Sequence, residues 1–289
     1  MEQLFKLFDE DFQQMQICNL QTIKEEYNVE ILKNIFNCID LTSLKTDDNI
    51  ESIKLFCTKV KYFQDRFADM PNVAAVCVYP VFAPVARKIL SGTGVKKAVV
   101  SAGFPSSQTF AEIKAAETKQ ALDYGANEID IVISVGEFLS GNYGQVAEEI
   151  KSVKWEMGNA KLKVILETGM LVTAENIWKA SLIAMNCGAD FIKTSTGKTD
   201  ISATPEAGFV MLHAIKAFYE KKGKKVGFKP AGGIVTVEDA MIYWSLVKNI
   251  LGDEWLNNNY FRIGASRLAN NVLTEIERIK GSDIVVNYF

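Results

Sequence analysis

The sequence predicts an α/β protein built as a closed (β/α)8 barrel of the TIM type, with an extra N-terminal helical segment. Eight short apolar or β-branched runs recur along the chain, each followed by a longer segment with helical spacing. A length of 289 residues suits one such domain, and no linker or repeat interrupts the order. These observations favour a closed barrel over an open doubly wound sheet. We expect residues 1–33 to form the helical extension and residues 34–289 the barrel with a short C-terminal tail.

The predicted strands are the runs richest in Val, Ile and other apolar residues. In chain order they are residues 34–41, 73–79, 96–103, 128–135, 161–168, 190–195, 226–232 and 260–266.

Polar residues and glycines mark the expected helix boundaries between these strands. The expected N-terminal caps are Asp47 and Asp48, Ser106 and Ser107, and Thr173, and the expected stops are Gly125, Gly188 and Gly223.

Composition narrows the classes of partner. The net charge is -3 and the lysines are scattered among acids, so no basic stripe suggests a nucleic-acid surface. The N-terminus lacks the cationic start and apolar run of a signal peptide, and no apolar stretch is long enough to span a bilayer. We therefore expect a cytoplasmic protein with no membrane and no nucleic-acid partner; a homo-oligomer is compatible with the sequence.

Cysteine and histidine usage limits the chemistry. The five cysteines, with no CxxC pair, are expected to be free thiols. His213 is the only histidine, and its helical segment offers no second ligand, so we interpret it as structural. A metal site and a His-based triad are therefore not expected, and neither is a cofactor. The remaining candidates for catalysis are Lys, carboxylate, Ser, Thr, Tyr or Cys side chains.

Polar residues lie in or at the ends of the predicted strands, where the active sites of this architecture gather. Because a polar side chain in an apolar strand is costly unless paired, their common position favours one shared site. These residues are Asp40, Thr42, Cys77, Asp130, Glu167, Lys193 and Lys229.

Lys193 and Lys229 end consecutive predicted strands, so their ammonium groups should be neighbours. Like charges in a desolvated pocket disfavour protonation, which makes one of the lysines a candidate nucleophile for carbonyl carbons. Asp130 would relay protons. Two simpler interpretations remain open: Lys193 extends from the strand end to water, and Asp130 only offsets a lysine charge.

Glycine-rich turns follow the predicted sixth, seventh and eighth strands. Turns of this kind expose backbone N–H groups to an anion at the start of a helix, and barrels often bind phosphate after strands seven and eight. Gly232, Gly233, Gly264 and Ser266 match that location.

The segments FIKTSTGK, FKPAGGI, VCVYP, IDLT and NEIDIVI make the chain resemble the 2-deoxyribose-5-phosphate aldolases, a metal-independent class I family with an (α/β)8 barrel. The resemblance covers about residues 36–280. It implies reversible cleavage of 2-deoxy-D-ribose 5-phosphate to D-glyceraldehyde 3-phosphate and acetaldehyde, with no cofactor. By motif position Lys193 would form the Schiff base, Lys229 would perturb it and Asp130 would relay protons. Substrate and phosphate would be held by Asp40, Thr42, Thr196, Gly197, Lys198, Gly232, Gly233, Gly264 and Ser266.

Two features depart from the family pattern. Val235 stands where many relatives carry a basic residue after the GGI turn, and Arg267 is the candidate to compensate. The 33 N-terminal residues exceed those of the shorter family members. We also expect Cys77 to serve packing, and we hypothesise that Tyr288 folds over the barrel mouth as a C-terminal tyrosine does in some relatives. The alternative functions are a lysine-dependent aldolase for another phosphorylated sugar and a non-catalytic sugar-phosphate-binding barrel.

Overall fold

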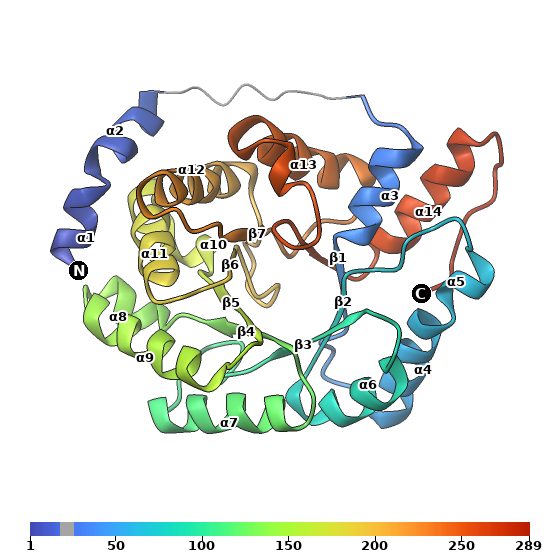
Figure 1. Ribbon diagram of the computed structural model, residues 1–289, viewed down its shortest axis with the longest axis horizontal. Helices are drawn as coiled ribbons and strands as arrows, with labels where there is room; N and C mark the ends of the chain where they lie inside the picture. The colour runs from blue at the N-terminus through green and yellow to red at the C-terminus, as the bar shows by residue number, and fades with distance from the viewer. Residues whose placement is uncertain (18–25) are drawn as a thin grey trace.

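The computed structural model describes residues 1–17 and 26–289, and eight parallel strands form its centre (Figure 1). The strands are β1 (Ile39–Thr42), β2 (Ala75–Val78), β3 (Lys96–Val100), β4 (Glu128–Val132), β5 (Lys161–Ile165), β6 (Phe191–Lys193), β7 (Gly227–Lys229) and β8 (Ile263–Ala265). All eight predicted strands are present, which confirms the predicted number of β/α units. The first is shorter than expected, because residues 34–37 belong to the helix before it.

The strands pair in chain order from β1 to β7, and β8 lies beside β1. Backbone bonds also join β8 to β7: the N–H of Arg262 donates to the carbonyl of Phe228, and the N–H of Gly264 donates to that of Pro230. The sheet therefore closes on itself, as predicted.

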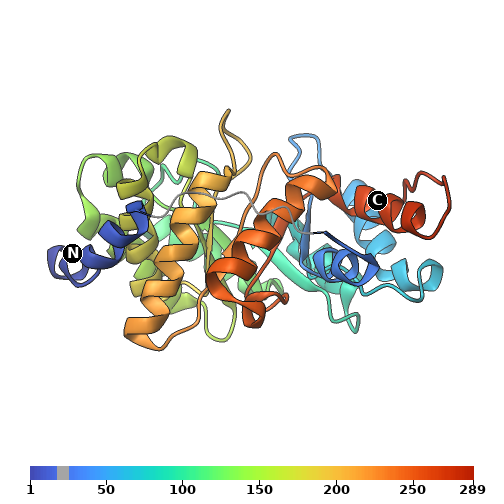
Figure 2. The ribbon, with the colours of Figure 1, turned by 90° about the horizontal axis from the view of Figure 1, so that it is seen from above.

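A helical layer surrounds the strands, and α12 and α13 lie side by side in it (Figure 2). One main helix follows each strand: α4 (Ile50–Lys61), α6 (Ala83–Leu90), α7 (Ala111–Asp123), α9 (Tyr143–Glu156), α11 (Ala174–Asn186), α12 (Pro205–Lys222), α13 (Val237–Leu251) and α14 (Leu268–Ile279). Shorter helices are α5 (Phe63–Arg66), α8 (Val135–Leu139), α10 (Thr168–Leu171), η1 (Pro80–Phe82) and η2 (Asp253–Trp255). Across the described residues, none of the helices has the length and apolar character needed to cross a membrane.

Alternation along the strands separates an apolar layer from a polar interior. In β4, Ile129 and Ile131 join the core between strands and helices, whereas Glu128 and Asp130 belong to the opposite face. Burying each isoleucine stabilises the fold by about 1.5–3 kcal/mol. The barrel interior contains charged groups instead of a fully apolar filling.

The N-terminal segment packs against the outside of this layer. Helices α1 (Glu2–Leu7) and α2 (Asp9–Ile17) bracket Phe8, whose ring stacks on Phe218 of α12 at 6.1 Å. Phe12 lies 5.5 Å from the ring of Trp178 in α11. Helix α3 (Val29–Asn37) lies beside α14 (Figure 1) and crosses the expected domain boundary at residue 33. The part of the predicted extension at residues 18–25, including Cys18, lies outside the described residues.

The predicted helix caps are partly wrong. Asn49, and neither Asp47 nor Asp48, caps α4, because the carboxylate of Asp48 accepts hydrogen bonds from residues of the preceding loop. Helix α7 starts after Phe110 without a side-chain cap, so the predicted pair Ser106 and Ser107 is also wrong. Thr173 caps α11 as predicted, accepting from the Asn176 N–H. Gly223, in the left-handed conformation, ends α12.

Candidate active site

A cavity of about 290 Å³ opens at the C-terminal ends of the strands. It is lined by residues that follow β1, β6, β7 and β8, which is the end where a barrel of this type places its site. The predicted residues in its wall are Thr42, Lys193, Thr196, Gly197, Lys198, Gly232, Gly233, Gly264, Ser266 and Arg267.

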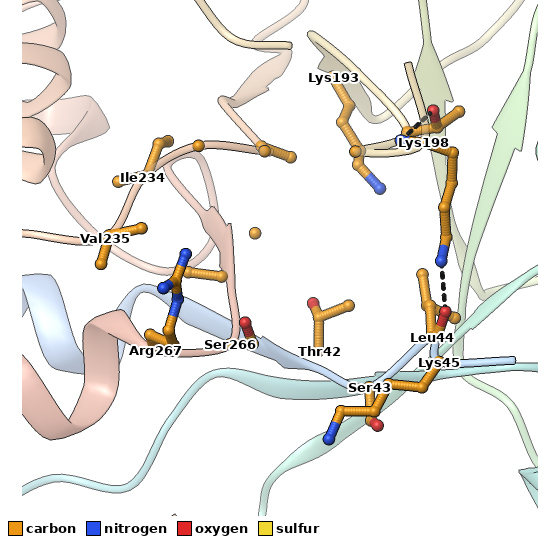
Figure 3. A pocket seen from close by; sticks show the side chains of 17 residues that line it. Thr42, Ser43, Leu44, Lys45, Lys193, Lys198, Ile234, Val235, Ser266 and Arg267 are labelled. Atoms are coloured by element: carbon orange, nitrogen blue, oxygen red, sulfur yellow. Dashed lines mark hydrogen bonds between the residues drawn. The ribbon is translucent and has the colours of Figure 1, made fainter. Parts of the chain in front are cut away.

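Lys193 is the last residue of β6 and forms the base of this cavity. Figure 3 shows its side chain directed into the open centre, with Arg267 and Val235 on one side and Lys198 on the other. The residue is only 3% exposed, and its Nζ donates to Asp130 Oδ2 at 3.0 Å. The amine is thus both desolvated and accessible from the cavity.

Lys229 lies directly beside Lys193 in the β6–β7 register, as the sequence predicts. It is fully buried, and its Nζ is 2.5 Å from Asp40 Oδ2 and 2.7 Å from Asp130 Oδ2. Asp130 Oδ2 therefore accepts a hydrogen bond from each of the two lysines. Lys229 and Asp130 lie beneath the cavity and are not part of its wall.

Three further charged residues of the barrel interior, Glu128, Lys163 and Arg262, were not predicted from the sequence. Lys163 in β5 contacts Asp40 at 2.9 Å, Glu128 at 2.6 Å and Asp130 at 3.0 Å. Arg262 donates to Glu128 and to Asp40. The overlooked signal is the alternation of side chains along a strand. Glu128 and Asp130 are two positions apart in β4, so they lie on one face of it. The same holds for Lys161 and Lys163 in β5. We call Asp40, Glu128, Asp130, Lys163, Lys193, Lys229 and Arg262 the barrel charge cluster.

The carboxylates of the cluster are held ionised. Burial opposes the charge of Asp40, but Lys163, Lys229 and Arg262 outweigh it and hold the pKa of Asp40 well below its usual range. Burial likewise opposes the charge of Asp130, yet the nearby lysines lower the pKa of its carboxyl. Glu128 shows the same balance. Burial raises the pKa of its carboxyl, but Lys163 and Arg262 lower it more, so the net direction is downward.

The lysines of the cluster differ from one another. Burial lowers the pKa of Lys193; Asp130 opposes that shift and Lys229 adds to it, so the net direction is downward. For Lys229 and Lys163 burial acts in the same direction, but the facing carboxylates dominate and raise the pKa of each. Lys193 is therefore the amine of the three that loses its proton most readily. Lys229 lowers the pKa of Lys193, as expected, although burial lowers this pKa more.

The opposite side of the cavity is built from turns. Gly197, Gly232 and Gly233 all have positive φ, at 75°, 84° and 80°, which favours glycine. Ser266 and Arg267 follow β8 and line the cavity immediately before α14, whose first turn has N–H groups without partners inside the helix. This side can hold an anion.

Gly264 stands where the neighbouring strand leaves no room for a side chain. A Cβ on Gly264 would lie 2.8 Å from Ala231 Cβ and 3.2 Å from Lys229 Cε. The absence of a side chain in β8 therefore lets Lys229 occupy its place between the carboxylates.

The loop after β6 is tied to neighbouring strands. Thr196 donates from its N–H and its hydroxyl to Glu167, a residue with φ of 56°. The Lys198 ammonium donates to the carbonyl of Leu44 on the facing wall (Figure 3). The loop that carries the FIKTSTGK motif is thereby held across the cavity.

Two predicted residues, Asp40 and Cys77, are buried and are not part of the cavity wall. Asp40, expected beside the substrate, is fully buried in the charge cluster, where its oxygens are occupied by Lys163, Lys229 and Arg262. Cys77 is buried beside Ala75 and Ala98, and burial raises the pKa of its thiol.

Tyr288, expected over the barrel mouth, lies elsewhere in this structure. Its hydroxyl donates to the carbonyl of Lys59, and its ring packs on Phe63 and Phe67 among the outer helices. It is not part of the cavity wall.

The remaining described cysteines and the histidine lie outside the wall of the substrate cavity. The cysteines among the described residues are buried free thiols: Cys38, Cys57, Cys77 and Cys187. His213 packs on the ring of Phe209 in α12, away from the cavity. Within the described ranges no group of His, Cys, Asp and Glu has the arrangement of a metal site.

Comparisons with known proteins agree with this geometry. Residues 37–266 match the family model described as DeoC/LacD family aldolase. Human deoxyribose-phosphate aldolase is 44% identical over 273 residues, covering 91% of this chain and 85% of the human protein. The mouse enzyme of the same name is 42% identical with the same coverage. The solved structure of deoxyribose phosphate aldolase from Aeropyrum pernix has a TM-score of 0.66 over 94% of this chain and 97% of that one; at 23% identity it supports the fold.

Proposed function

The chain belongs to the DeoC/LacD family of aldolases, and on this premise we propose that it reversibly cleaves 2-deoxy-D-ribose 5-phosphate to D-glyceraldehyde 3-phosphate and acetaldehyde. The reaction runs through a Schiff base on Lys193. One observation carries this role: among the lysines of the charge cluster, Lys193 reaches the cavity, and its pKa is lowered while those of Lys163 and Lys229 are raised.

The neutral amine of Lys193 adds to C1 of the open-chain sugar, and loss of water from the carbinolamine gives an iminium. The iminium accepts the electron pair of the C2–C3 bond as the C3 hydroxyl loses its proton. D-Glyceraldehyde 3-phosphate leaves, the enamine takes a proton at C2, and hydrolysis of the resulting iminium releases acetaldehyde and the free lysine.

Asp130 is the proposed proton carrier of this sequence. Its Oδ2 is 3.0 Å from Lys193 Nζ, within direct reach of the carbinolamine nitrogen. Because the pKa of its carboxyl is held below the usual range, Asp130 stays ionised and passes protons on transiently. Lys229, bonded to the same oxygen, keeps that carboxylate in place.

The phosphate of the substrate is assigned to the turn side of the cavity. Gly232 and Gly233 offer backbone N–H groups there, and Ser266 and Arg267 precede the N-terminus of α14. Val235 is uncharged where many relatives carry a basic residue. Arg267 lies on the same side of the cavity (Figure 3) and supplies a cation there instead. In this proposal the phosphate lies across the cavity from the Lys193 amine.

The function is tested by measuring acetaldehyde release from 2-deoxyribose 5-phosphate, with ribose 5-phosphate as the competing sugar. We expect turnover of the deoxy sugar and a loss of at least about 10³-fold in Lys193→Arg, because a guanidinium stays protonated and cannot add to a carbonyl. Borohydride added with acetaldehyde should leave an ethyl group on Lys193, detectable by peptide mass analysis. Turnover of ribose 5-phosphate alone, detected as glycolaldehyde and D-glyceraldehyde 3-phosphate, would indicate the alternative lysine-dependent aldolase. Labelling of another lysine would refute the role of Lys193.

A further inference from the structure

The barrel charge cluster extends to the end of the barrel opposite the substrate cavity. A second cavity, of about 340 Å³, opens there. Its wall includes the first residues of β3, β4 and β5, which are Lys96, Glu128 and Lys161, together with Arg262 just before β8. The cluster therefore joins the two ends of the barrel, with Lys193 at one and Arg262 at the other.

Arg262 is fixed at its end by two carboxylates. Its Nη1 donates to Asp40 Oδ1 at 2.6 Å, and its Nη2 donates to Glu128 Oε1 at 2.8 Å. Asp40 and Glu128 use their other oxygens for Lys163, at 2.9 Å and 2.6 Å. Lys163 also contacts Asp130, the carboxylate that receives Lys193. Arg262 is thus linked to the Schiff-base lysine through shared carboxylates.

The formal charges of the cluster do not balance. Its cations are Lys163, Lys193, Lys229 and Arg262, and its anions are Asp40, Glu128 and Asp130. Four cations face three anions, and every member is buried. An uncompensated charge is costly in such a site, so the cluster favours the loss of one proton. Without Arg262, three lysines would face three carboxylates and no proton would be in surplus.

We propose that Arg262 is a positioning residue for the aldolase reaction: from the far end of the barrel it supplies the fourth cation and thereby makes Lys193 the amine that gives up its proton. The proposal rests on the proposed function, because it assigns the control of the nucleophile used there. Arg262 does not touch the substrate cavity and acts through Asp40, Glu128 and Lys163.

The groups that face Lys193 differ from those that face Arg262, so Arg262 acts on Lys193 through the cluster and not by direct contact. The groups with electrostatic influence on Lys193 come from several strands: Asp130 from β4, Lys229 from β7 and Cys77 from β2. Burial raises the pKa of Cys77, so this thiol adds no charge. Arg262 faces Asp40, Glu128 and Lys163, with Lys161 nearby and the ring of Phe191 at 5.6 Å. Burial opposes the charge of Arg262, but the two carboxylates dominate and raise its pKa, so it remains a cation.

The test uses substitutions that change the charge balance in opposite directions. For each variant, kcat/KM for acetaldehyde release is measured against pH, because its acid limb reports the protonation of the free enzyme. Arg262→Met removes a cation, so we expect the acid limb to move to higher pH by about one unit. Glu128→Gln removes an anion and keeps the shape, so the limb should move to lower pH. The double variant restores one surplus cation and should return the limb toward the wild-type position.

Controls separate electrostatics from structure. Arg262→Lys keeps a cation and should hold the limb near its wild-type position, while Lys96→Gln removes an exposed charge from the same far cavity and should leave the limb unmoved. Melting temperatures of all variants check folding. If Arg262→Met does not fold, Glu128→Gln alone provides the test. An acid limb of its kcat/KM profile that stays in place or moves to higher pH would overturn the proposal. A wild-type protein that releases no acetaldehyde would refute the proposed function instead.

Discussion

Lys193 and Lys229 are paired in register and have the same side chain, yet their surroundings assign them different roles. Lys229 contacts two carboxylates, at 2.5 Å and 2.7 Å, and has no solvent exposure. Lys193 contacts one carboxylate, at 3.0 Å, and reaches the cavity. Because each opposite charge stabilises the ammonium form, the lysine with fewer partners is the one that becomes a neutral amine. The number of carboxylate partners therefore identifies the nucleophile.

Lys229→Leu should impair catalysis by raising the pKa of Lys193. The substitution removes a like charge beside Lys193 and frees Asp130 to stabilise its ammonium form, with the added desolvation offsetting part of the effect. A raised pKa means that less neutral amine is present at a given pH, so the acid limb of kcat/KM should move to higher pH. The measurement is the pH profile, with Lys229→Arg as the charge-preserving control. A wild-type profile in Lys229→Leu would show that the second lysine does not tune the first.

The site residues that could be predicted from the sequence are those whose charge interrupts or ends an apolar run, as Asp130 and Lys193 do. Lys163 and Arg262 were missed because they lie toward the N-terminal ends of their predicted strands, whereas active-site residues are expected at the C-terminal ends. Their burial depends on closure of the barrel, which brings five different strands together around one axis. A local pattern contains no information about partners so distant in the chain.

At the scale of single elements, the strands were easier to predict than the ends of the helices. A buried strand is encoded by several apolar residues together, whereas a cap depends on one side chain and on the loop before it. In the loop before α4 three adjacent polar residues compete, and contacts with Ser43 and Lys45 divert Asp48. The N–H groups of Glu51 and Ser52 are therefore left to Asn49.

Asn49→Ala should lower the free energy of unfolding by about 1 kcal/mol, because the capping box of α4 loses its acceptor for two backbone N–H groups. For a domain of this size that is a fall of about 2 °C in melting temperature. Asp47→Ala is the matched control, since Asp47 is exposed and its side chain does not cap the helix. Equal destabilisation by both substitutions would contradict the observed cap.

At the scale of the whole molecule, the C-terminal tail connects helices that are distant in sequence. Asn270 in α14 accepts from the N–H groups of Tyr288 and Phe289, and Phe289 packs on Phe36 of α3 and Phe63 of α5. The sequence predicts a short tail, but the hypothesis that Tyr288 covers the barrel mouth differs from the position seen here, because an aromatic terminus can cover any apolar surface within reach. The tail joins the outer layer on the side where the chain enters the barrel.

Deleting residues 287–289 should destabilise the fold and leave catalysis unchanged. The deletion removes several aromatic pairs, each worth about 0.5–1.5 kcal/mol, so we expect a loss of about 2 kcal/mol in unfolding free energy. Chemical denaturation measures that loss, and kcat for acetaldehyde release measures the activity. Tyr288→Phe provides the control, as it removes only the hydrogen bond to Lys59. A fall in kcat with an unchanged denaturation midpoint would restore a catalytic role for the tail.

The substrate cavity has two kinds of wall, and they offer different prospects for protein engineering. The amine side rests on strands whose charged groups form ion pairs with one another, so a single replacement there leaves a partner unpaired, and such positions tolerate only concerted change. The phosphate side consists of turn residues 232–235 and of Ser266 and Arg267, which precede helices and carry none of those ion pairs. Libraries that vary these turns, with Gly232 and Gly233 kept for their backbone conformation, should yield enzymes for unphosphorylated aldehydes that retain the carbon–carbon bond chemistry.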